Sequence, residues 1–96
     1  MKKTDDYKKL NHALKLFKVL SNANRLKIAK FLAEAKDSSA IVSDILKGTG
    51  VAETNLSNHL KLMRISGILS ARQDGTNIYY TIKDHAIKPL LAAALV

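Results

Sequence analysis

The run from residue 42 to residue 82 constrains the fold more than any other part of the chain. Residues 39–47 and 53–66 carry apolar side chains at helical spacing, and Gly48-Thr49-Gly50 separates the two segments. Glycine tolerates the left-handed backbone conformation that ends helices, so the tripeptide marks a turn. These residues therefore predict a short helix, a turn and a second helix.

After this second helix the apolar pattern changes to the two-residue period of a β-strand. Ile78, Tyr80 and Ile82 alternate with other residues along one face. Residues 68–73 and 77–83 are expected to form a hairpin closed by Asp74-Gly75, a strong short-range hairpin signal. Two helices joined by a turn and followed by a hairpin predict a winged helix-turn-helix over residues 39–82, a unit that reads DNA.

Two further helices are predicted before this unit. In residues 5–20, Leu10, Leu14 and Phe17 follow the i, i+4, i+7 pattern of one helix face. Residues 21–24 supply polar side chains that break this helix and cap the next one, residues 23–35.

One more helix is predicted after the hairpin, with Asp84 as its cap. Pro89 lacks an N–H, so the regular turns are expected to begin near that residue. The fold class is therefore mainly α with a small β-hairpin wing, in the order α-α-α-α-β-β-α. The length of 96 residues predicts one domain, residues 1–96.

The charge balance points to a polyanionic partner. The formal net charge is +8, which favours nucleic acid first and an anionic membrane second, although plain solubility is the alternative explanation. The excess lies in residues 1–37, with ten Lys or Arg against four Asp or Glu. These lysines fall on several sides of the first helix, unlike those of a membrane-surface helix. Double-stranded DNA is therefore the expected partner, and binding to a membrane is not expected.

Several other classes of protein are disfavoured by what the chain contains. No segment approaches the roughly 18 apolar residues of a membrane span and no signal peptide is recognisable, so a cytoplasmic, nucleoid-associated protein is expected. The chain has no cysteine, which rules out disulfides, cysteine zinc sites and thiol sensing. It shows no nucleophile–base set, paired carboxylates or phosphate loop, so it is not expected to be an enzyme.

The outer face of the second helix of the unit is the predicted DNA-reading surface. It lies opposite the apolar stripe Leu56, Leu60 and Met63. Asn58 is suited to pair with adenine, and Thr54 to touch a thymine methyl or a phosphate. The residues expected to contact DNA are Thr54, Asn55, Ser57, Asn58, His59 and Lys61 on the helix, and Arg72, Gln73, Thr76 and Asn77 on the wing. The alternative for the helix face is an ordinary solvated surface.

For four residues of this helix, two possible roles are compared. Ser57 and Lys61 are expected to hold phosphate and set the register rather than to read bases. His59 lies nearer the core edge, so a half-buried or phosphate-contacting histidine is preferred over a base-reading one. Glu53 either accepts a hydrogen bond from cytosine or complements the helix dipole, and the second reading is preferred.

Two segments resemble the ArsR-type winged-helix transcriptional repressors of bacteria and archaea. Residues 56–69 read LSNHLKLMRISGIL, and residues 17–28 read FKVLSNANRLKI, in which Arg25 matches the characteristic arginine of the family. The resemblance implies a homodimeric repressor that binds an inverted-repeat operator in the major groove. Its alternative is a winged-helix protein-interaction module or a non-specific nucleoid binder.

The same resemblance implies that the first and last helices, about residues 5–20 and 85–96, form the dimer interface. Composition supports this independently, because the last helix is apolar on all sides after Lys88 and needs a cover. The alternative is a tail that packs on its own core. The residues expected at the interface are Leu10, Leu14, Phe17, Leu90, Leu91, Ala94 and Leu95.

The sequence departs from the family pattern at the turn. Ala52 stands where a capping serine is common and Thr49 where a leucine is usual, so a looser turn is expected.

The metal sites of relatives are also incomplete in this chain. Ile41 and Ser43 occupy the positions of a Cys-x-Cys pair, and Ala86 that of a histidine ligand near Asp84. No cofactor or high-affinity transition-metal site is therefore expected. A metal or pH-sensing site shared between subunits and involving His12 or His85 stays open, as do the effector, the operator and the regulated genes.

Overall fold

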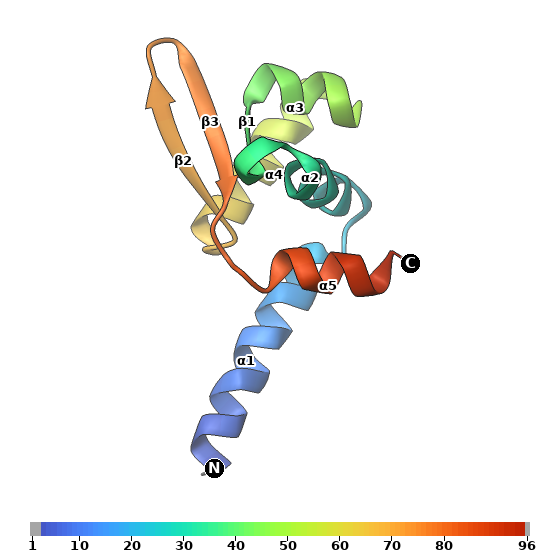
Figure 1. The fold of residues 1–96 in the computed structure, drawn as a ribbon, viewed down its shortest axis with the longest axis vertical. Helices are drawn as coiled ribbons and strands as arrows, with labels where there is room; N and C mark the ends of the chain where they lie inside the picture. The colour runs from blue at the N-terminus through green and yellow to red at the C-terminus, as the bar shows by residue number, and fades with distance from the viewer. Residues whose placement is uncertain (1–2, 96) are drawn as a thin grey trace.

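The computed structural model describes residues 3–95, which form five helices and a small antiparallel sheet (Figure 1). The helices are α1 (Lys3–Leu20), α2 (Ala23–Glu34), α3 (Val42–Thr49), α4 (Glu53–Ile65) and α5 (Ile87–Ala94), with one 3₁₀ turn, η1 (Lys36–Ser38). The strands are β1 (Ser39–Ile41), β2 (Leu69–Asp74) and β3 (Asn77–Ile82). The predicted order of helices and hairpin is confirmed, with η1 and β1 in addition.

α1 projects from the body of the molecule like an arm, with the N-terminus at its far end (Figure 1). Among residues 5–20 of this helix, only Leu16, Val19 and Leu20 near its C-terminal end are buried. The Asn22 side chain then caps α2 by accepting hydrogen bonds from the backbone N–H groups of Asn24 and Arg25, at 3.0 and 3.1 Å. The predicted helix break and cap are thus confirmed.

The segment before α3 differs from the prediction. The sequence pattern predicts one helix over residues 39–47, but residues 39–41 form β1 and α3 begins only at Val42. β1 pairs antiparallel with β3, Ser39 opposite Thr81 and Ile41 opposite Tyr79. This pairing satisfies backbone groups that the end of a short helix would leave without partners, and it joins residues some forty positions apart that no local pattern connects.

The turn between α3 and α4 is closed by a side chain. Thr49 Oγ1 donates to the Ile45 carbonyl at 2.7 Å and accepts from the Val51 N–H at 3.3 Å. Gly50 adopts the left-handed conformation, with φ +69°. Ala52 makes no side-chain cap, as expected. Thr49 therefore bridges both sides of the turn, and the expectation that it loosens the turn is wrong.

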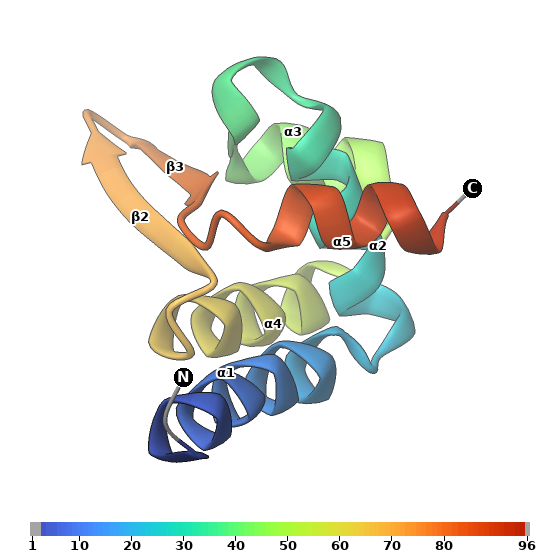
Figure 2. The same cartoon turned by 60° about the horizontal axis from the view of Figure 1, so that its bottom comes forward.

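The sheet has the strand order β1-β3-β2 and carries the wing (Figure 2). The last pair of the hairpin joins Asp74 to Asn77, so Gly75 and Thr76 form its two-residue loop rather than Asp74-Gly75. Gly75 has φ +64°, which a residue without a Cβ adopts without strain. The hairpin projects on the side of the molecule opposite to the C-terminus (Figure 2).

The core lies between α2, α3, α4, the base of the sheet and α5. Its fully buried large side chains are Ile28, Leu32, Ile45, Leu56, Leu60, Met63, Ile68, Leu69 and Ile87. Phe31 packs against this core but is only half-buried, and Ala35, the residue that follows α2, is half-buried as well. None of the helices in residues 3–95 is both long and apolar enough to cross a membrane.

α5 begins two residues before the expected start at Pro89. Pro89 is its third residue, where the backbone N–H would lack a partner within the helix in any case. Asp84 does not cap the helix directly, but its Oδ1 accepts from the Ala86 N–H at 3.0 Å in the preceding turn. Ile87 and Leu91 face the core, so part of the tail packs on its own chain.

Candidate nucleic-acid interface

The outer face of α4 is open to solvent and mostly polar, with Leu62 and Ile65 as exposed apolar side chains toward its C-terminal end. Leu56, Leu60 and Met63 hold the helix to the core. The residues predicted to read DNA from this helix are exposed, with one exception described below: Thr54, Asn55, Ser57, Asn58 and Lys61. Short polar side chains on an exposed helix face match the geometry needed to reach base edges in a major groove.

A groove of about 340 Å³ connects α4 to α3 and the wing tip. Ser57 of α4 lines it together with Thr76 and Asn77 of the wing, so the fold brings three of the predicted site residues to one surface. Ser43 and Glu53 line it as well. Both helices therefore present first-turn residues to the same groove, and the carboxylate of Glu53 lies where it complements the positive end of the α4 dipole.

Ser43 was missed as a site residue by the sequence analysis. It is the second residue of α3, but in the predicted helix of residues 39–47 it fell in the middle. Only the pairing of β1 with β3 reveals that α3 begins next to Ser43. No local signal in the sequence marks this boundary.

His59 is the exception on α4, because it is half-buried and faces α2. Its Nδ1 lies 3.4 Å from Nη1 of Arg25, whose Nε donates to the Val19 carbonyl at 2.6 Å. A guanidinium only donates, so Nδ1 acts as the acceptor of a neutral imidazole. Burial, and then the charge of Arg25, lower the pKa of His59. The histidine therefore ties the reading helix to the α1–α2 junction, which agrees with the half-buried alternative.

Two of the four wing residues are engaged within the hairpin. The Arg72 guanidinium lies 4.8 Å from the centre of the Tyr79 ring and its Nη1 lies 3.7 Å from Asp74 Oδ2. Gln73 Nε2 donates to the Gly75 carbonyl at 3.2 Å, which braces the loop. Thr76 and Asn77 are exposed at the tip. Arg72 and Gln73 thus hold the shape of the wing, and Thr76 and Asn77 form its outermost surface.

The structure pairs two of the acidic and imidazole groups considered as sensor residues. His12 Nε2 lies 2.7 Å from Asp84 Oδ2, which links α1 to the segment before α5. Burial raises the pKa of Asp84, but the Ala86 N–H, His12 and the charge of Lys15 outweigh it and lower the pKa overall. His85 is exposed and takes no part. Within residues 3–95 no three His, Asp or Glu side chains gather as metal ligands would.

Comparison with known proteins places the chain in a family. The model described as "Bacterial regulatory protein, arsR family" matches residues 22–71, more than half of the chain. This chain belongs to the ArsR family. Over 83 residues it is 32% identical to the HTH-type transcriptional regulator MJ1325 of Methanocaldococcus jannaschii, covering 86% of this chain and 91% of that protein.

Solved structures of two bacterial proteins share the fold. The transcriptional repressor BigR from Xylella fastidiosa superposes with a TM-score of 0.83 and 28% identity, covering 97% of this chain and 92% of BigR. The homodimeric winged helix-turn-helix domain of Mb0332 from Mycobacterium bovis superposes with a TM-score of 0.77 and 28% identity, covering 98% of this chain and 84% of that chain. The ArsR resemblance, the winged helix-turn-helix fold and the function of a DNA-binding transcriptional regulator are therefore confirmed.

Proposed function

We propose that this ArsR-family chain is a homodimeric repressor that binds an inverted-repeat operator through α4. The observation that carries the proposal is the exposed polar face of α4, which adjoins a groove shared with α3 and the wing tip. In this proposal residues 1–96 act as one cytoplasmic, non-enzymatic domain. Residues 39–82 form the DNA-reading unit, and residues 5–20 and 85–96 form the pairing surface.

Each residue of the reading surface has a role that follows from its place. Asn58, central on the exposed face of α4, pairs with adenine in the major groove, and Thr54 contacts a thymine methyl. Ser57 and Lys61 hold phosphates, and Ser43 at the first turn of α3 adds a further phosphate contact across the groove. His59, engaged with Arg25, positions α4 rather than reading a base.

The exposed apolar side chains of α1 support pairing of two copies. Tyr7, Leu10, Leu14 and Phe17 are between 51% and 61% exposed, and together they form an apolar stripe that a small domain does not cover itself. A second copy covers such a stripe by two-fold symmetry, and the similar domain of Mb0332 is homodimeric.

α5 contributes less to this pairing surface than its composition suggests. Leu95 is 47% exposed and Ala94 is exposed, whereas Leu90 is half-buried and Leu91 is buried in its own chain. In the proposed dimer, Ala94 and Leu95 therefore make the α5 contacts, and Leu91 supports them from within.

Selection of bound sequences from random duplex DNA, at near-physiological salt, tests the proposal. We expect enrichment of an inverted repeat whose half-sites are about 10 base pairs apart, because two α4 helices must enter successive turns of one DNA face. Asn58→Ala is expected to lose the preference for adenine at one position of each half-site, by about 1–3 kcal/mol. Ser21→Ala, at an exposed serine outside the pairing surface and the DNA-reading unit, is the control and should select the same sequence.

The non-specific nucleoid binder remains the competing function, and one observation favours it. The basic excess lies in residues 1–37 rather than in the reading unit. Salt-sensitive binding without any enriched sequence would support this alternative and would refute the roles given to Thr54, Ser57 and Asn58.

A further inference from the structure

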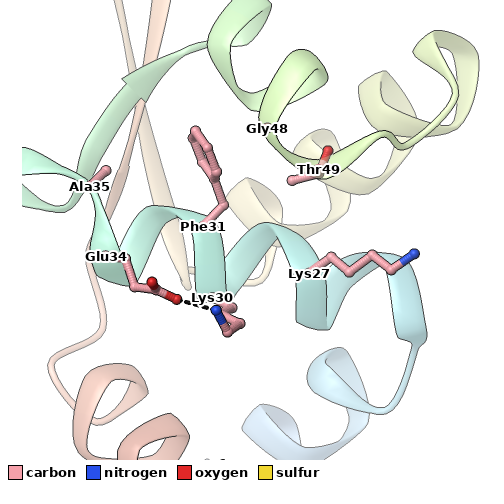
Figure 3. A pocket seen from close by; sticks show the side chains of 7 residues that line it. All are labelled: Lys27, Lys30, Phe31, Glu34, Ala35, Gly48 and Thr49. Carbon is pink, nitrogen blue, oxygen red and sulfur yellow. Dashed lines mark hydrogen bonds and ion pairs between the residues drawn. The ribbon is translucent and has the colours of Figure 1, made fainter.

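A second groove lies between α2 and α3, away from the residues assigned to DNA (Figure 3). Its volume is about 370 Å³, within the range of small-molecule sites. Its lining residues are Lys27, Lys30, Phe31, Glu34, Ala35, Gly48 and Thr49. No role in the proposed DNA contact uses this groove.

The aromatic wall of the groove depends on Gly48. In Figure 3 the Phe31 ring points from α2 toward Gly48. A Cβ atom built at Gly48 would lie 2.0 Å from Cε1 of Phe31, so the ring packs directly on the glycine backbone. Phe31 is nevertheless only half-buried, and part of its ring borders the open volume. Such a ring attracts another flat ring in an offset or edge-to-face arrangement.

The rim of the groove carries unbalanced positive charge. Lys30 forms an ion pair with Glu34, one turn away on α2. Lys27 is exposed and makes no ion pair with any residue between 3 and 95. Figure 3 shows it extending along α2 at the Thr49 end of the groove. An aromatic wall beside an unpaired ammonium group is complementary to a flat apolar molecule with one negative charge.

We propose that this groove binds a small planar aromatic carboxylate, with its ring against Phe31 and its carboxylate near Lys27. Thr49 lines the groove, and its hydroxyl closes the turn that leads into α4. A bound carboxylate therefore contacts the turn that positions the reading helix. Binding itself is independent of DNA, whereas an effect on operator affinity rests on the function proposed above.

Binding is tested on the full chain, without DNA, by following backbone amide signals in two-dimensional NMR spectra. The probe is 2-naphthoate, which is expected to bind with a dissociation constant of about 1 mM. Saturable shifts should centre on the amides of Lys27, Phe31, Gly48 and Thr49. The uncharged analogue 2-naphthylmethanol has the same rings and should bind about threefold more weakly, since the exposed lysine contributes modestly.

Matched variants test whether 2-naphthoate binds to this groove or only responds to the positive charge of the whole protein. Lys27→Gln should weaken 2-naphthoate binding about threefold, whereas Lys83→Gln, at an exposed lysine outside the groove, should leave it unchanged. Phe31→Leu keeps an apolar contact for Gly48 but removes the ring, and should weaken binding about fivefold. If Phe31→Leu does not fold, the two lysine variants and the uncharged analogue still test whether the carboxylate binds in this groove.

Three results would overturn the binding site: no saturable shifts, shifts centred outside the groove, or equal weakening in the two lysine variants. The regulatory step is tested separately, by measuring the affinity for the selected operator with and without saturating 2-naphthoate. A change is expected in the wild type, and in Lys27→Gln the same change should require about threefold more 2-naphthoate. An unchanged affinity in the wild type would overturn that step. Failure to select any operator would refute the proposed function while leaving the naphthoate titration interpretable.

Discussion

Replacing Thr49 by valine tests whether one hydroxyl group closes the turn before the reading helix. Valine keeps the size and the branched shape of threonine, so the substitution removes the two hydrogen bonds of Oγ1 and little else. The bond to the Ile45 carbonyl is short, at 2.7 Å, and the bond from the Val51 N–H is long, at 3.3 Å. The expected effect is therefore a loss of folding free energy without a change of fold.

The magnitude follows from these two bonds. A neutral hydrogen bond contributes about 0.5–1.5 kcal/mol net, and Thr49 is half-buried rather than fully enclosed. If the short bond contributes fully and the long one in part, Thr49→Val loses about 1–2 kcal/mol of folding free energy. For a domain of this size each kcal/mol lowers the melting temperature by about 4–8 °C, so a decrease of about 4–16 °C is expected.

The assay is thermal unfolding followed by circular dichroism, at one fixed protein concentration because a dimer unfolds in a concentration-dependent way. Thr54→Val is the matched control, since Thr54 is exposed on α4 and valine and threonine have similar helix propensities. It should change stability by less than about 0.5 kcal/mol. Equal melting temperatures for Thr49→Val and Thr54→Val would refute the closing role of the hydroxyl.

Three further predictions concern the N-cap of α4, the pairing surface on α1 and the half-buried His59. Ala52→Ser, at the N-cap of α4 that has no side-chain bond, should stabilise the fold by about 1 kcal/mol in urea unfolding; no gain would show that the backbone there does not admit a cap. Leu14→Glu, in the exposed stripe of α1, should convert a dimer to a monomer in sedimentation, whereas Lys8→Glu, at an exposed lysine off this stripe, should not. Two dimeric variants would refute the α1 interface. Because the pKa of His59 is lowered in the fold, the unfolded chain takes up its proton first, so stability should fall as pH drops below 6.5. In His59→Gln, the midpoint of urea unfolding should change less between pH 7.5 and 5.5 than in the wild type. An equal change would contradict the conclusion that His59 causes this pH dependence.

Patterns within one element predicted which face of α4 is buried and which is exposed. The stripe of Leu56, Leu60 and Met63 lies in the core, which leaves Thr54 and Asn58 exposed on the other side of α4. This succeeded because the helical period links side-chain direction to sequence spacing within a single helix. The cap at Asn22 was equally local, since its side chain bonds the N–H groups two and three residues later.

Patterns that depend on a second element were missed or misplaced. The expected helix of residues 39–47 lost its first three residues to β1, because their partners lie on β3. The contact between His12 and Asp84 spans 72 positions, and helical spacing alone gave no reason to join them. The groove under Phe31 likewise needs α2 and α3 to meet at Gly48, where the absence of a Cβ allows the contact.

The order of the helices, the turn and the hairpin could be read from the chain, because helix periods, caps and turn residues act over a few neighbouring positions. The ArsR resemblance and the exposed face of α4 followed from the same local patterns. Tertiary structure alone decided where α3 begins, that Leu91 faces inward while Leu95 stays exposed, and that Ser43, Ser57 and the wing tip share one groove. These features depend on which distant surfaces pack together, and the free energy of that packing comes from buried apolar area, which a one-dimensional pattern does not locate.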